Sequence, residues 1–273
     1  MGYTDDGAIA THALVFMVRG LRTKSKQASI CIFAFFFTAP KLTELISECI
    51  DRLCEVGLIV RCIICDQGAT NMAAVRNLGC TGNNLSFTRP CLSQVVYVIY
   101  DAPHLLKSVR NNFVKHDVMF DNHTARWKHI AAFYQLDKAS SIRLAPKLTD
   151  RHIDFSNQAK TRVCLAAQVL SHSVAAGLQA RVVTKLPDVA LGTALFVEQV
   201  DKLFDMLNSR KKHDATPAKC ALTADNDNIK TLMSLKDWVC KWTFVGARAP
   251  TAIKCHQGLL VSVQILCLCH VHY

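Results

Sequence analysis

The sequence predicts an α/β first half followed by a mostly helical second half. In the first half, two runs of β-branched and apolar residues, 59–65 and 95–100, each end abruptly at an aspartate, Asp66 or Asp101. Such runs are typical of buried strands that deliver a carboxylate to the edge of a sheet. Over residues 125–242, amphipathic helical patterns follow one another and strand patterns are few.

The first elements form a predicted hairpin and a helix. Strand patterns cover residues 9–22 and 28–37, and their spacing is compatible with a hairpin. Pro40 then opens a predicted helix over residues 41–56, whose apolar positions recur at helical spacing. Gly57 marks its end.

Two further strand and helix patterns complete the first half. A buried strand over residues 58–65 precedes a short helix over 68–78, and a polar loop over 81–93 leads to the central strand. That strand enters a helix whose apolar residues share one face, while Lys107 and Arg110 share the other. This order predicts a mixed sheet with helices packed against it.

Short breaks divide the helical second half. They fall at Ala145-Pro146, at Leu186-Pro187 and in the polar stretch 211–217. The chain contains no internal repeats. This half is therefore predicted to be helical throughout.

Composition limits the class of protein. Hydrophobic residues make up 51% of the 273 residues, which excludes wholesale disorder. Lys and Arg outnumber Asp and Glu by 32 to 21, a net charge of +11 that suits a polyanion such as nucleic acid. The chain begins without a signal-peptide pattern, and its longest apolar stretches fall short of the roughly 20 residues of a membrane span. No membrane association is expected.

The 13 cysteines follow no disulfide framework. Many of them lie inside apolar runs, which indicates reduced core residues of an intracellular protein. The C-terminal Cys267, Cys269, His270 and His272 are residue types that bind zinc, but they are too tightly spaced to surround one ion easily.

Several motifs taken together resemble the transposases of the P element class. They occur in family order, with spacings close to those of the family, across nearly the whole chain. The stretches are GYTDDG, THALVFMVRGL, CDQGATN, DAPHLLKSVRNN, WKHI, KLTDRHIDF, TRVCLAAQVLSHSVA, LFDMLNSR and QGLLVSVQIL. The resemblance implies an incomplete RNase H-like core over residues 1–120, a helical GTP-binding insertion over 121–258 and a truncated return to the core over 259–273.

The resemblance also implies a metal-binding role for Asp66. That residue matches the second of three acidic residues that hold the catalytic Mg²⁺ ions. The alternative is that Asp66 caps the helix that begins near Gly68. The motif containing Asp101 and His104 is expected to be structural or to face DNA, and His104, Lys107 and Arg110 are the candidates for DNA contact.

In the insertion, the resemblance places nucleotide contacts on or near six residues. Asp205 has a chemical reason to be among them, because a carboxylate can accept hydrogen bonds from both N1–H and the exocyclic amine of guanine. Phe204 could support the base by stacking, and Lys147 could meet phosphate. The alternative is the polar end of an ordinary amphipathic helix. The six residues are Lys147, Val163, Ser171, Phe204, Asp205 and Asn208.

The chain is expected to be a catalytically inactive fragment of a GTP-dependent cut-and-paste transposase. In the family, the first acidic ligand precedes GYTDDG and the last follows QGLLVSVQIL, so both fall outside this sequence. Asp5 and Asp6 match a turn instead of the catalytic strand. The zinc-dependent THAP module and the leucine-zipper-like segment typical of the family are also missing.

The resemblance implies DNA and GTP as partners, a possible homo-oligomer and a nuclear location. One alternative is a domesticated, non-catalytic module that binds nucleic acid or another protein. Another is an active nuclease that uses Asp66, Asp101 and a further carboxylate such as Asp6, a metal site that the family does not have.

Overall fold

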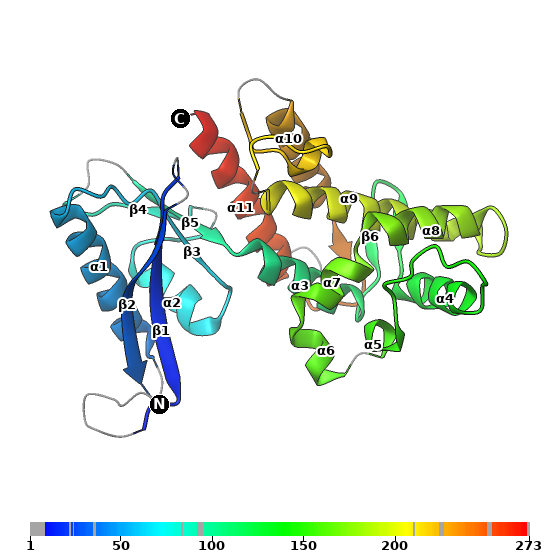
Figure 1. Cartoon of the computed structure of the whole chain (residues 1–273), viewed down its shortest axis with the longest axis horizontal. Coiled ribbons are helices and arrows are strands. Elements are labelled where there is room, and N and C mark those ends of the chain that lie inside the picture. Colours follow the sequence, from blue (N-terminus) through cyan, green and yellow to red (C-terminus); the bar gives the residue numbers. More distant parts are fainter. Residues whose placement is uncertain are drawn as a thin grey trace. The chain divides into compact units, whose positions relative to one another are not determined.

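The computed structural model describes residues 9–21, 23, 25–34, 37–82, 84–91, 95–154, 156–209, 211–223, 227–249 and 253–271. Asp5, Asp6 and His272 lie outside these residues, as do the side chains of Cys269 and His270. The chain divides into two compact units, Met1–Val98 and Ile99–Tyr273. Figure 1 shows their elements.

The first unit opens with the expected hairpin. Strands β1 (His12–Arg19) and β2 (Lys26–Ala34) pair antiparallel, with Leu14 opposite Ile32 and a register shift between Phe16 and Met17. The two strands form a sheet of their own. The predicted hairpin is therefore confirmed.

Helix α1 (Ala39–Glu55) begins and ends where local signals place it. The Thr38 side chain accepts a hydrogen bond from the Lys41 amide, Pro40 occupies the first turn, and Gly57 follows the helix with φ of 78°. A positive φ suits glycine, which has no Cβ to clash with the backbone. The apolar stripe of the helix is buried and includes Leu42, Leu45, Ile46, Cys49 and Ile50.

A three-stranded sheet carries the two aspartate-terminated strands. Its order is β3 (Cys62–Cys65), β5 (Val96–Tyr100), β4 (Ser86–Phe87), and β4 runs antiparallel to β5. Helix α2 (Ala69–Asn77) follows β3 and packs on α1. Alternate residues of β5 are fully buried, as in a central strand.

Two details of this sheet differ from the sequence pattern. A strand is predicted over residues 58–65, but β3 covers only the second half of this range, and Ile59 is exposed. The backbone pairs with β5 only from Arg61, whose carbonyl accepts from Tyr97. The predicted polar loop contains β4, a strand of two residues that is too short to give a periodic pattern.

The second unit begins with α3 (Ala102–Phe113) and a small sheet that the sequence pattern did not predict. Strands β6 (Val118–Phe120) and β7 (His123–Ala125) form a hairpin, and β8 (Thr243–Phe244) pairs with β6. The turn residues Asp121 and Asn122 have φ of 40° and 63°. Such positive values are typical of tight hairpin turns.

Helices make up most of the rest of this unit. Helix α9 (Leu191–Leu207) lies against α8, α10, α3 and α4, and its Phe196 packs on the rings of Phe113, Trp238 and Trp242. These aromatic contacts form the centre of the core. The other helices are α4 (Trp127–Lys138), α5 (Asp150–Ile153), α6 (Asn157–Thr161), α7 (Val163–Val169), α8 (His172–Val182), α10 (Asn228–Cys240) and α11 (Lys254–Val271), with 3₁₀ turns η1 (Asp188–Ala190) and η2 (Pro217–Lys219).

The long helical pattern over residues 157–182 is divided into α6, α7 and α8. The backbone leaves the helical conformation at Arg162, and again at Leu170 and Ser171. Among the described residues, Val163–Val182 is long and apolar enough to cross a membrane by length and composition alone, and 44% of it is buried inside the protein.

Substituting Gly177 tests the packing of α8 on α4. An alanine Cβ there would lie 2.4 Å from Cζ of Phe133, far inside van der Waals contact. We expect Gly177→Ala to lower the free energy of unfolding by about 2 kcal/mol, whereas helix propensity alone would raise it by about 1 kcal/mol. Urea denaturation measures whether the free energy of unfolding falls or rises. Ala176→Gly, at an exposed neighbouring position, is the control for propensity, and stabilisation by Gly177→Ala would contradict the packing.

Candidate functional site

Asp66 lies where β3 leads into α2, and its carboxylate bonds to the turn that precedes the helix and to one side chain of its first turn. Its Oδ1 accepts hydrogen bonds from the Gly68 amide at 2.8 Å and from Nδ2 of Asn71 at 2.7 Å. A Cβ at position 68 would lie 2.9 Å from the same oxygen, so glycine leaves room for the carboxylate. The carboxylate thus closes a local turn at Gly68, but it does not cap a first-turn amide of α2 as the alternative interpretation expected. The catalytic role of Asp66 stays a prediction.

Binding of Mg²⁺ near Asp66 would require several carboxylates to point at the same position. Within the parts of the chain that the structure describes, no group of three or more His, Cys, Asp or Glu side chains is placed to hold a metal ion. One carboxylate with an oxygen already engaged cannot hold two catalytic ions by itself. The Mg²⁺ site therefore stays a prediction.

The Asp-x-x-His motif forms the N-terminal cap of α3. Oδ2 of Asp101 accepts from the His104 amide at 3.1 Å and lies 3.0 Å from Nδ1 of the same histidine. The aspartate thereby satisfies an amide that the first helical turn leaves without a partner. A structural role as helix cap therefore explains the spacing of the motif. Lys107, one turn further along α3, is half-buried.

Arg110 does not lie on an exposed basic face, which corrects the prediction that it contacts DNA. Its side chain is 0% exposed, and Nη2 donates to the carbonyl oxygens of Ala159 at 2.9 Å and Lys160 at 3.3 Å. These carbonyls belong to the last turn of α6, which needs donors. Burial lowers the pKa of the guanidinium. Arg110 therefore ties α3 to α6.

Three of the six predicted nucleotide contacts lie at the end of α9. Phe204 and Asp205 are on its last turn, and Asn208 is its C-terminal cap residue. Oδ2 of Asp205 lies 3.5 Å from Nζ of Lys219 in η2, and the aspartate side chain is 21% exposed. The carboxylate is thus partly accessible and already paired with a cation.

Asp201, one helical turn before Asp205, contacts the start of α8. Its carboxylate accepts a hydrogen bond from the backbone of His172, which directly follows Ser171. Burial and the nearby charge of Asp205 raise the pKa of Asp201 to about 6. The hydroxyl of Ser171 donates to the carbonyl of Gln168 at 2.9 Å. The start of α8, next to Ser171, therefore contacts α9 one turn before Asp205.

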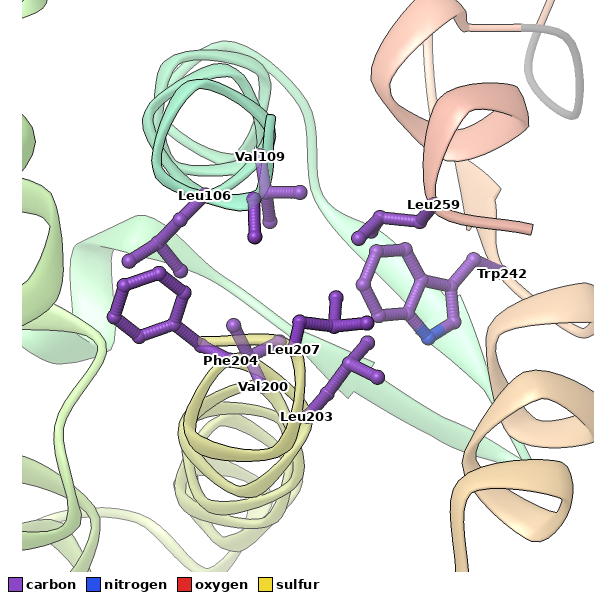
Figure 2. A pocket seen from close by; sticks show the side chains of 9 residues that line it. Leu106, Val109, Val200, Leu203, Phe204, Leu207, Trp242 and Leu259 are labelled. Atoms are coloured by element: carbon purple, nitrogen blue, oxygen red, sulfur yellow. The ribbon is translucent and has the colours of Figure 1, made fainter. Parts of the chain in front are cut away.

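Phe204 lines a small apolar cavity between α9 and α3. Figure 2 shows its ring facing Leu106, with Val109, Leu207 and Trp242 around the same space. The cavity volume is about 10 Å³, enough for roughly one water molecule. A purine base cannot enter this space. Stacking on Phe204 would have to use the exposed part of the half-buried ring.

Lys147 is exposed on a loop after α4 that a buried ion pair holds in shape. The carboxylate of Asp137 is 0% exposed. It accepts hydrogen bonds from Nε of Arg143 at 3.1 Å and from the Leu144 amide at 2.6 Å. Arg143 in turn donates to the carbonyl of Leu148 at 2.8 Å. Val163, the remaining predicted contact, begins α7. Lys147 and Val163 therefore come from other elements than Ser171 and Asp205.

Two family models match this chain. The model of the TNP-like RNase H N-terminal domain matches residues 1–79, and that of the TNP-like GTP-binding insertion domain matches residues 103–220. Through these two domains the chain is homologous to P element transposases. It is 28% identical over 197 residues to the transposable element P transposase of Drosophila melanogaster, covering 71% of this chain and 26% of that protein. It is 27% identical over 175 residues to the human DNA transposase THAP9, covering 61% of this chain and 19% of THAP9.

The fold of the family is also seen in a solved structure. The Drosophila P element transposase strand transfer complex matches with a TM-score of 0.82 at 21% identity, over 99% of this chain and 61% of that one. This likeness confirms the predicted fold class, an α/β RNase H-like region followed by a mostly helical insertion. The chain spans about a quarter or less of the two curated P element relatives. The domain boundaries predicted at residues 120 and 258 stay predictions.

Sequence reasoning missed Asp201, Lys219 and Asp137, which shape the surroundings of this family's candidate site. Asp201 carried one usable signal, because it lies four residues before Asp205 and therefore on the same helical face. Lys219 and Asp137 carried none, since their partners are recognisable only in the folded chain.

The raised pKa of Asp201 predicts a pH-dependent effect on stability. Between the ordinary value of 3.8 and about 6, the folded state keeps a proton that the unfolded state has lost, so stability falls as pH rises through this range. We expect Asp201→Asn, which keeps an acceptor for His172, to raise the free energy of unfolding by about 1 kcal/mol at pH 7 after allowance for solvent screening. Little change is expected at pH 4.

Urea unfolding at the two pH values measures this difference. Asp227→Asn, at an exposed carboxylate, is the control for removing one negative charge. An equal gain from Asp201→Asn at pH 4 and pH 7 would contradict the explanation by ionisation.

Proposed function

We propose that the second unit binds guanine nucleotide and that the chain forms part of a P element-type transposase. The observation that carries the proposal is the placement of Asp205. Its partly accessible carboxylate lies at the end of α9 near the start of α8, within the residues that match the GTP-binding insertion model. A carboxylate in such a place can recognise a base by its hydrogen-bond donors.

The residues present fit a guanine nucleotide by their chemistry. Asp205 would accept from N1–H and from the exocyclic amine of guanine, a pair of donors that adenine does not offer. Lys219 already pairs with one oxygen of this carboxylate, so a bound guanine would share the carboxylate with that lysine or displace it. Phe204 would support the base from the exposed part of its ring, with Asn208, Ser171 and Val163 around it. Lys147 would meet phosphate.

DNA and Mg²⁺ belong to the proposed activity of the larger protein. The curated relatives are named as transposases, and the solved neighbour is a strand transfer complex. A net charge of +11 suits a DNA partner, and Lys107, Lys115 and Lys128 are candidate phosphate contacts with His104. We expect this chain to act in the nucleus, with a homo-oligomer as one possible assembly.

We further propose that this chain by itself does not cut DNA. The support is the local geometry of Asp66, one of whose carboxylate oxygens already accepts from the Gly68 amide and the Asn71 side chain. Mg²⁺-dependent nicking by the purified chain, lost in Asp66→Ala, would contradict this proposal and favour the nuclease alternative.

Nucleotide binding is tested with the full chain and a fluorescent GTP analogue. We expect saturable binding that unlabelled GTP reverses and ATP does not. Absence of binding by a chain with a folded circular dichroism spectrum would overturn the proposed function. Equal displacement by ATP and GTP would overturn the assignment of Asp205.

The second candidate function is a domesticated module that binds nucleic acid without catalysis. The charge of +11 favours it. DNA binding that weakens steeply with salt, in a chain that binds no guanine nucleotide, would support this candidate over the first.

A further inference from the structure

Two thiols face each other in the first unit, where the last turn of α1 meets the segment after β4. Sγ of Cys54 lies 2.9 Å from Sγ of Cys91, and both are free thiols. A disulfide bond is about 2.05 Å long, so the sulfurs need to approach by less than about 1 Å. We propose that Cys54 and Cys91 form a reversible disulfide that fastens residues 88–91 to the end of α1.

Asp51, one helical turn before Cys54, holds Cys91 beside that cysteine. Arg89 forms an ion pair with Oδ2 of Asp51, and its Nε donates to Oδ1 at 3.3 Å. Sγ of Cys91 donates to the same Oδ1 at 3.2 Å. Two residues of the 88–91 segment are thus bound to one carboxylate of α1. The reduced protein already holds Cys91 beside Cys54, so closing the bond requires little loss of chain entropy.

The pair is also accessible to a small oxidant, in contrast to the buried cysteines of the protein. Cys91 is exposed and Cys54 partly exposed, whereas Cys49, Cys80 and Cys255 are buried. Burial raises the pKa of Cys80 to about 11 and that of Cys255 to about 12, which keeps these thiols protonated and unreactive. A small oxidant can therefore reach the Cys54–Cys91 pair.

Oxidation by glutathione disulfide proceeds in two exchange steps. The Cys54 thiolate attacks one sulfur of glutathione disulfide, which forms a mixed disulfide and releases one glutathione thiolate. The released glutathione thiolate takes the proton of Cys91, whose sulfur then attacks Sγ of Cys54 and releases the second glutathione as a thiolate. That thiolate takes up a proton from water. Two protein thiols are oxidised, and one small disulfide is reduced to two thiols.

The hydrogen bond from Cys91 to Asp51 holds this thiol in its protonated form. The hydrogen bond with Cys54, together with partial desolvation and Asp51, raises the pKa of Cys91 to about 12. Cys91 therefore keeps its proton at neutral pH, which assigns the first attack to Cys54. Replacing Asp51 by asparagine weakens the contacts with Arg89 and Cys91, so Cys91 is held less firmly beside Cys54.

The test uses the full chain in a buffer of reduced and oxidised glutathione, followed by acid quenching, alkylation and peptide mass spectrometry. We expect a linked pair of peptides containing Cys54 and Cys91, lighter by two hydrogen atoms, which dithiothreitol separates. Exposed Cys240 is the internal control, and it should carry only a glutathione adduct. In Cys91→Ser, the adduct should accumulate on Cys54. In Asp51→Asn, ring closure should slow several-fold with the same adduct as intermediate.

Recovery of Cys54 and Cys91 as two separate glutathione adducts, or as unmodified thiols while Cys240 is oxidised, would overturn the proposal. A dominant link from either cysteine to a different one would do the same. Circular dichroism of the reduced variants establishes that each is folded before the exchange is measured.

Discussion

Asp205→Asn is expected to remove the preference for guanine and to weaken GTP binding about 100-fold, the loss of two charge-assisted hydrogen bonds to the base. Asparagine has the shape of aspartate but presents an amine in place of one oxygen, so the pair of acceptors for guanine is gone. The end of α9 should keep its packing, because the side chain at this position is already partly exposed.

Xanthosine triphosphate sharpens the same experiment. Xanthine carries an oxygen where guanine carries the exocyclic amine. This oxygen can accept from the side-chain NH₂ of asparagine, while N1–H of xanthine donates to the side-chain oxygen of asparagine. Asp205→Asn should therefore bind xanthosine triphosphate better than the wild-type chain does. Competition with a fluorescent nucleotide measures both affinities, and Asp188→Asn, at an exposed carboxylate of the same unit, is the matched control. Unchanged GTP affinity in Asp205→Asn would contradict the assigned role.

Asp137→Ala is expected to give the largest loss of stability. The buried carboxylate is bonded to Arg143 and to the amides of Leu144 and Ala145. Removing it leaves these donors without their acceptor, which typically costs about 3–5 kcal/mol for a buried ion pair. The loop that carries Lys147 should lose its shape, so nucleotide affinity should fall as well.

Urea denaturation and nucleotide binding measure these two effects of Asp137→Ala. Asp150→Asn is the matched control, because its ion pair with Lys138 is exposed and should contribute little to stability. Asp137→Asn, which keeps an acceptor for the amides, should fall between the two. A loss in Asp137→Ala no larger than that in Asp150→Asn would show that the buried pair does not hold the loop.

Elements with local signals could be predicted from the sequence. Helix α1 has Thr38 and Pro40 at its start, an apolar stripe along its length and Gly57 after its end, and the structure uses all of these. The sheet of β6, β7 and β8 could not be predicted in this way. Its strands have two or three residues, and β8 pairs with β6 across more than a hundred residues of chain. Such pairings depend on tertiary packing and leave no periodic pattern.

The candidate site was predictable only in part. The resemblance supplied Asp205, whereas its neighbours Asp201 and Lys219 emerge only when α8, α9 and η2 are packed together. Arg110 shows the opposite error. A helical pattern places it opposite the apolar residues of α3, but the pattern cannot indicate that the end of α6 covers that side.

Hydrogen–deuterium exchange of the full chain with GTP or ATP tests the location of the nucleotide most directly. We expect GTP to slow exchange in three segments, the loop with Lys147, the start of α8 and the end of α9, and ATP to leave exchange there unchanged. The β1–β2 hairpin should exchange equally in all samples. Binding of GTP without protection at the end of α9 and the start of α8 would contradict the proposed site.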